Sequence, residues 1–120
     1  MRQTKHTTVL VAASTGAVDQ GGTVYTSAVW NVKEGHEDGF ARAWQESVDA
    51  ASLELPGIVF RLLRDAESPR RFTSNAGPWR SLEQITAMRS SPEFQASMAS
   101  IAEHLDSYES STWELVAEVS

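Results

Sequence analysis

The spacing of apolar residues changes repeatedly along this chain between the two-residue period of a β-strand and the 3.6-residue period of an α-helix. Residues 23–32 are rich in β-branched and aromatic side chains that alternate between two faces, which predicts a strand. Residues 36–52 carry Phe40, Trp44 and Val48 at helical spacing, with two acids in the first turn, where the helix dipole favours them. The chain therefore contains a strand followed directly by an amphipathic helix.

A β-hairpin is predicted next. Residues 57–64 are apolar on nearly both faces, and residues 71–76 return as a second strand after a turn that contains Asp, Ser and Pro. Gly77 and Pro78 are residue types that commonly interrupt regular secondary structure, so we expect the second strand of the hairpin to end there.

Two helices and a last strand complete the pattern. The first helix is predicted over residues 81–89, and the second begins at Ser90 or Ser91 and ends near Asp106. Residues 108–119 alternate apolar and polar side chains, which predicts the final strand. The second helix has an apolar stripe that consists of Phe94, Met98, Ile101 and Leu105.

The order strand, helix, strand, strand, helix pair, strand is that of the split βαβ, ferredoxin-like α+β fold, with an antiparallel sheet and helices on one face. A chain of 120 residues, 41% of them apolar, has the length of one domain and enough apolar surface for one core. We assign this domain to residues 23–120. Residues 1–22 are expected to form a flexible leader, with a short extra strand at residues 7–13 as an alternative.

The strand at residues 57–64 adds a further requirement, because it is apolar on both faces whereas helices can cover only one face of such a sheet. The second face needs another cover. A second copy of the chain, packed sheet against sheet, is the economical solution, so we expect a homodimer with a large interface.

The charge distribution argues against nucleic acid as a partner. Ten Lys and Arg residues stand against 16 Asp and Glu residues, and the formal net charge of −6 opposes binding to a phosphate backbone. Six arginines lie between residues 61 and 89, and six acids but no Lys or Arg follow residue 90. This basic middle and acidic C-terminal third could pair within the fold or between subunits, although solvated faces explain most of the charges.

The sequence also lacks the residues and segments needed for cysteine-dependent sites, for secretion and for membrane insertion. Without cysteine the chain has no disulfide, thiolate nucleophile, Cys-ligated zinc or iron–sulfur cluster. The apolar run near the N-terminus is too short for a signal peptide, and no segment approaches the length of a membrane helix, so we expect a soluble cytoplasmic protein with no membrane partner.

The titratable residues form no recognisable catalytic motif. His6, His36 and His104 are linked by no spacing, and the acids beside His36 fit a helix start, so we assign no metal. No serine lies in a nucleophile elbow, and the glycines form no phosphate-binding loop.

The aromatic residues remain as candidates, and Trp79 is the most informative of them. It closely follows Asn75, a polar residue in a buried strand context that requires a partner or a ligand. In the alternative interpretation, Trp79 only anchors the helix pair to the hairpin, and the Asn75 amide satisfies a neighbouring backbone group.

A succession of short motifs resembles the antibiotic biosynthesis monooxygenase (ABM) domain, a family of the dimeric α+β barrel superfamily. The resemblance covers residues 23–119, and the order and spacing of the motifs are specific together. The motifs are Val-Lys-Glu-Gly-His-Glu-Asp-Gly-Phe (32–40), Leu-Pro-Gly-Ile-Val (55–59), Leu-Leu-Arg-Asp (62–65), Asn-x-x-x-Trp (75–79) and Ser-Pro-Glu-Phe-Gln (91–95).

This resemblance implies a monooxygenase that uses no flavin, metal or haem cofactor and acts on a small aromatic, anthrone-type or quinol metabolite. The carbanion or enolate of the substrate would reduce dioxygen, while the protein binds the anion and excludes water. Asn75 and Trp79 match pocket residues of such enzymes, where the amide bonds the substrate oxygen and the indole packs on the ring and donates its N–H. Trp30, Phe60 and Met98 are expected to line the pocket.

Departures from the family pattern leave the substrate open. The pocket Tyr and Arg of related polyketide oxygenases would fall near Leu63 or Ile85 and near Met98. The Asn, Trp and His of the haem-degrading branch would fall at Ala28, Met88 and Met98, so haem binding and haem degradation are the less favoured alternatives. A non-catalytic, dimeric ligand-binding or interaction module is the main alternative function.

Overall fold

The computed structural model describes residues 23–120. The proposed leader, its alternative strand at residues 7–13 and His6 lie outside the described residues. Four strands and three helices follow one another along the chain. They are β1 (Val24–Val32), α2 (Glu37–Ser52), β2 (Val59–Arg64), β3 (Arg71–Trp79), α3 (Leu82–Ser90), α4 (Pro92–Ala102) and β4 (Leu105–Glu114).

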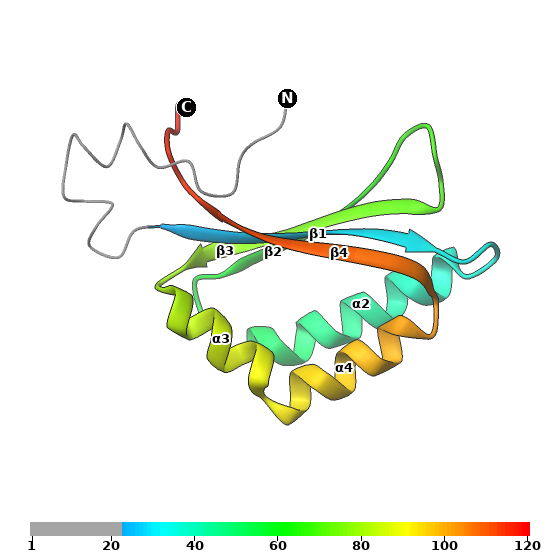
Figure 1. The fold of residues 1–120 in the computed structure, drawn as a ribbon, viewed down its shortest axis with the longest axis horizontal. Coiled ribbons are helices and arrows are strands. Elements are labelled where there is room, and N and C mark those ends of the chain that lie inside the picture. The colour runs from blue at the N-terminus through cyan, green and yellow to red at the C-terminus, as the bar shows by residue number, and fades with distance from the viewer. Residues whose placement is uncertain (1–22) are drawn as a thin grey trace.

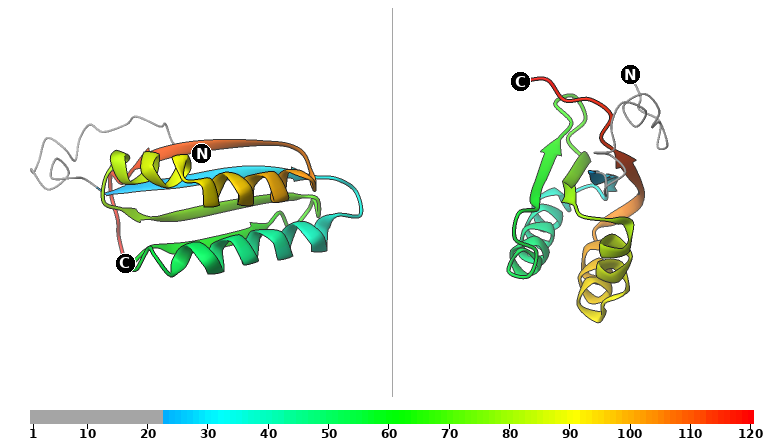
Figure 2. Two further views of the ribbon diagram at one scale, coloured as in Figure 1. Left: turned by 90° about the horizontal axis from the view of Figure 1, so that it is seen from below. Right: turned by 90° about the vertical axis from the view of Figure 1, so that its left-hand side faces the viewer.

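The strands form one antiparallel sheet in the order β2-β3-β1-β4, and all three helices lie on the same face of it (Figure 1). Figure 2 shows α2 under one half of the sheet and α3 and α4 under the other half. The α+β, ferredoxin-like arrangement predicted from the sequence is therefore confirmed, with one face of the sheet left uncovered by helices.

Strand register decides which side chains meet the helices. On the central strand β1, Ala28 and Trp30 are buried beneath the helices, and they pair with Ser74 and Phe72 on β3. Because successive side chains point to opposite faces, the even-numbered residues of these two strands up to Ala76 face the helices, and the odd-numbered residues face away. This alternation confirms the two faces predicted for β1.

Local sequence signals explain where the helices start. Ser81 Oγ accepts a hydrogen bond from Gln84 N at 3.0 Å and caps α3, and Ser91 Oγ accepts one from Phe94 N at 3.1 Å and caps α4. Gly35, in the turn before α2, has a φ of 86°, a conformation that residues with a Cβ rarely adopt.

Three predicted strand boundaries are wrong, and strand pairing explains them. β3 does not stop at Gly77 and Pro78, because an irregularity in its pairing with β1 absorbs one extra residue and the strand continues to Trp79. The last strand begins at Leu105, where it pairs with Val32, and ends at residue 114 instead of 119. β1 begins at Val24, the partner of Glu114, so β4 ends there. Because β4 already begins at Leu105, α4 ends at Ala102 and is shorter than predicted.

The turn of the β2–β3 hairpin is held by one carboxylate. The backbone N–H of Glu67 donates to Asp65 Oδ1 at 2.8 Å, and Arg71 Nη1 donates to Asp65 Oδ2 at 3.2 Å. These two donors favour the charged form and lower the pKa of the Asp65 carboxyl from its ordinary value.

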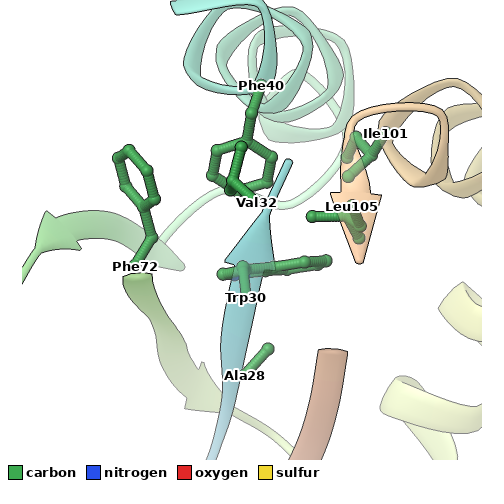
Figure 3. Close-up of a cluster of buried hydrophobic side chains, with 7 residues drawn as sticks. All are labelled: Ala28, Trp30, Val32, Phe40, Phe72, Ile101 and Leu105. Atoms are coloured by element: carbon green, nitrogen blue, oxygen red, sulfur yellow. The ribbon is translucent and has the colours of Figure 1, made fainter. Parts of the chain in front are cut away.

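The main core lies between β1, α2 and α4, at the end of the sheet where α2 begins (Figure 3). Phe40 is fully buried there, and its ring centroid lies 5.5 Å from that of Trp30 and 4.9 Å from that of Phe72. The other buried members are Ala28, Val32, Ile101 and Leu105.

Truncation of the central core ring tests this arrangement. We expect Phe40→Ala to lower the free energy of unfolding by about 3–5 kcal/mol, because it leaves a cavity between Trp30 and Phe72. Urea denaturation followed by circular dichroism measures the change. Leu53→Ala is the control, since Leu53 is 84% exposed and its loss should change the free energy of unfolding by less than about 0.5 kcal/mol. Equal effects of the two substitutions would contradict the assignment of the core.

Candidate functional site

A cavity of about 870 Å³ lies between the sheet and the helices. Its lining includes Trp30 and Ile101 of the main core and Gln84 and Met88 of α3. Figure 2 shows α2 and α3 under different halves of the sheet. The volume of the cavity is in the range typical of small-molecule sites. Its helical walls include Trp44, Ser47, Val48, Ala51, Gln84, Ala87, Met88, Phe94, Ser97 and Met98.

The cavity exists because the sheet carries small side chains at its centre. Ala28, Ser74 and Ala76 face the helices in neighbouring positions of β1 and β3, and all three have short side chains. Large aromatic rings border the cavity around this small-residue floor. Such a space suits a flat, largely apolar molecule with a few polar substituents.

Trp79 forms one wall, and its N–H is already bonded. The side chain is only 2% exposed, and Nε1 donates to Thr26 Oγ1 and to the Ala76 carbonyl oxygen, both at 3.1 Å. The ring of Phe60 stands perpendicular to the indole at a centroid distance of 6.3 Å. The N–H of this indole is therefore already used within the protein.

Trp30 separates the main core from the cavity. Its ring stacks on Tyr108 at a centroid distance of 5.3 Å and touches Phe40 on the core side. Nε1 donates to Ser74 Oγ at 2.9 Å, so one buried indole holds a hydroxyl group on the cavity floor.

Asn75 and Trp79 both line the cavity, but strand register places them differently on the sheet. The register partners of Asn75 are Ser27 on β1 and Arg61 on β2, positions on the sheet face away from the helices. The residue whose side chain takes the corresponding place on the helical face is Ser74, one position earlier.

The other predicted pocket residues also border the cavity. Trp30 lies on β1, Phe60 on β2 and Met98 on α4, and all three border it. Sequence reasoning missed the hydroxyl groups of Ser74, Ser97 and Tyr108, because serine and tyrosine at helix and strand positions carry no motif.

Charged residues border the cavity only on its outer parts. Glu54, Arg80 and Glu93 are exposed, and Arg89 is half-buried at the end of α3. The inner surface is apolar apart from hydroxyl and amide groups, so the interior binds through shape, ring contacts and hydrogen bonds rather than ion pairing.

A histidine pair lies away from this cavity, at the start of α2. His36 Nδ1 and His104 Nδ1 are 3.1 Å apart, a hydrogen bond in which one of the two nitrogens must accept. Gly39 makes room for the second ring, since a Cβ there would lie 2.8 Å from His104 Cε1. In the described part of the chain, no group of three or more His, Cys, Asp or Glu side chains is arranged to hold a metal ion.

Comparison with known proteins identifies the family. Residues 23–100, more than half of the chain, match the family described as antibiotic biosynthesis monooxygenase. The chain therefore belongs to the antibiotic biosynthesis monooxygenase family. No curated protein sequence matches it.

Solved structures share the fold at low sequence identity. A proposed antibiotic biosynthesis monooxygenase from Caulobacter crescentus CB15 aligns with a TM-score of 0.72 and 14% identity over 82% of this chain and 93% of that chain. SnoaB, a cofactor-independent oxygenase from Streptomyces nogalater, aligns with a TM-score of 0.72 and 16% identity over 82% and 97% of the two chains. A conserved protein from Methanosarcina mazei Go1 aligns with a TM-score of 0.69 and 16% identity over 79% and 94%.

None of the helices found between residues 23 and 120 is long and apolar enough to cross a membrane.

Filling the cavity tests whether it binds ligands. Ser97→Trp places an indole at a half-buried α4 position that borders the cavity, whereas Ala96→Trp adds the same group at the exposed neighbouring position outside it. We expect Ser97→Trp to weaken binding of the fluorescent dye ANS by at least about tenfold, a loss of about 1.4 kcal/mol, and Ala96→Trp to leave binding close to wild type. Fluorescence titration measures both. Equal dissociation constants for the two variants would place the dye elsewhere.

Proposed function

We propose that this protein is a monooxygenase that oxidises a small phenolic metabolite of the anthrone or quinol type with dioxygen and needs no cofactor. The observation that carries the proposal is the cavity beside Trp30 and Trp79, whose aromatic walls and hydroxyl-bearing floor suit a flat aromatic substrate with oxygen substituents. Family membership and the fold shared with SnoaB support this reaction class.

In the proposed reaction the substrate supplies the electrons. Loss of a proton from an activated C–H gives a delocalised anion, which reduces dioxygen. One oxygen atom enters the product as a carbonyl oxygen, and the other leaves as water. The cavity contributes by holding the anion flat between aromatic rings, by stabilising its oxygen with hydrogen bonds and by excluding bulk water.

The two residues carried over from the resemblance contribute differently to the proposal. Trp79 is proposed as the ring on which the substrate packs, held in place by its hydrogen bonds to Thr26 and Ala76. The register of Asn75 gives no support for a contact between its side chain and a ligand in this cavity. A role for its amide is therefore not part of the proposal.

The uncovered face of the sheet supports a homodimer. Leu63 and Val59 of the edge strand β2 are 52% and 47% exposed, and they lie on the face away from the helices. Packing a second copy against this face would cover them. A cytoplasmic location also belongs to the proposal, since a cysteine-free chain needs no oxidising compartment.

One observation favours a second candidate, a ligand-binding module without catalysis. Of the three tryptophans that border the cavity, Trp30 and Trp79 have their indole N–H groups bonded to protein acceptors. The carboxylates that border the cavity, Glu54 and Glu93, are exposed to solvent. No histidine borders the cavity in the described residues. A protein of this kind would bind the same aromatic molecules and leave them unchanged.

Oxygen uptake distinguishes the two candidates. With a panel of anthrones and hydroquinones, we expect wild-type protein to consume dioxygen and Trp79→Phe to lower kcat/KM by about tenfold, or 1.4 kcal/mol in transition-state stabilisation. Trp113→Phe is the matched control, because Trp113 Nε1 also donates to a hydroxyl, Ser27 Oγ at 2.7 Å, but on the other face. Binding of the panel without oxygen uptake would favour the binding module.

The oligomeric state is tested separately. We expect wild-type protein to elute as a dimer by light scattering at concentrations of about 1–10 μM, and Leu63→Glu to elute as a monomer, because it buries a carboxylate in the interface. Leu53→Glu makes the same change at an exposed position at the end of α2 and should leave the dimer intact. A wild-type monomer in this range would overturn the proposed dimer.

A further inference from the structure

Ser74 is the polar residue buried among the core residues of the described chain, and it occupies a central position on the cavity floor. It lies on β3, between Ala28 on β1 and Leu62 on β2. It is 8% exposed, and neither of these apolar neighbours can bond its hydroxyl. A buried hydroxyl in such a setting needs partners for both its oxygen and its proton.

The oxygen of Ser74 has its partner in Trp30. An indole N–H can only donate, so Ser74 Oγ must accept in the 2.9 Å hydrogen bond between them. Among residues 23–120, the bond from Trp30 is the hydrogen bond that the Ser74 side chain makes, and its own proton is not donated to a protein acceptor. The Ser74 hydroxyl can therefore still donate its proton in a hydrogen bond, and the cavity is the space beside it.

We propose that Ser74 is the binding residue that donates a hydrogen bond to the oxygen of the bound phenol or enol, in its anionic form. This inference rests on the proposed function and names the group that recognises the substrate's anionic oxygen. The Ser74 proton is shared and not transferred, so the step forms no covalent bond. Trp30 acts through Ser74 as a positioning residue, because its N–H fixes the hydroxyl and polarises it toward the ligand.

The contact also explains why the floor of the cavity is built as it is. A donor beneath a flat ligand can reach its oxygen only if the neighbouring side chains are short, and Ala28 and Ala76 flank Ser74 on the same face. Since a hydrogen bond to the charged form favours that form, the contact should lower the pKa of a bound phenol.

The dye alizarin provides the test, because its absorbance changes when a phenol deprotonates. We expect a spectrophotometric pH titration of alizarin bound to the wild-type protein to give a lower apparent pKa than for free dye. Ser74→Ala should raise this pKa by about one unit and weaken binding of the anionic dye by about tenfold. Trp30→Phe, which keeps a ring but loses the N–H, should give a smaller rise.

Three further variants separate this role from a structural one. Ser74→Thr keeps the hydroxyl and should retain the low pKa of the bound dye, while Ser74→Cys keeps the size with a weaker donor and should give an intermediate value even if Ser74→Ala fails to fold. Ser107→Ala removes an exposed hydroxyl that accepts from Asn31 Nδ2 elsewhere on the sheet, and should change neither dye affinity nor pKa.

The outcomes are distinguishable from failure of the proposed function. If alizarin binds Ser74→Ala and Ser74→Cys with the wild-type affinity and pKa, the Ser74 contact is overturned while the aromatic site stands. If only Asn75→Ala weakens alizarin binding and raises the pKa of the bound dye, the contact belongs to Asn75 and not to Ser74. If wild-type protein binds neither alizarin nor the anthrones, both the proposed function and this inference are overturned.

Discussion

Both the core and the cavity depend on the contacts that the side chain of Trp30 makes with Phe40 and Ser74. One edge of the ring packs against Phe40, in the region where the helices lie close to the sheet, and its N–H fixes Ser74 on the other side. A ring of this size on the central strand closes the core against the space beside it. The same residue therefore sets the end of the tightly packed region and the start of the cavity.

The packing of the sheet differs sharply between its two ends. Val32, Phe72 and Leu105 fill the space under α2 and α4 near the start of α2, whereas alanines and a serine leave it open farther along the strands. Interiors are otherwise close to full density, so an opening this large must be maintained by rigid walls. The aromatic rings of Trp79 and Phe60 provide such walls, which is consistent with their perpendicular contact.

Periodicity in the sequence was sufficient to predict the order and type of every described element, because the spacing of apolar residues differs between the strands and the helices. It was not sufficient for the site. The choice between Ser74 and Asn75 depends on strand register, and a shift of one residue moves every side chain to the other face. The contact between His36 and His104 joins residues 68 positions apart, which only the three-dimensional fold could reveal.

The irregular pairing before the end of β3 determines the face of the sheet on which the Trp79 side chain lies. Val24 pairs with Trp79 and Thr26 with Ala76, so three residues of β3 span the distance covered by two residues of β1. This single extra residue brings the indole back to the helical side after Gly77, which lies against the Tyr25 ring on the opposite side. The face of the sheet to which Trp79 points thus depends on the number of residues between Ala76 and Trp79. Deletion of any one residue between them would direct the indole away from the cavity.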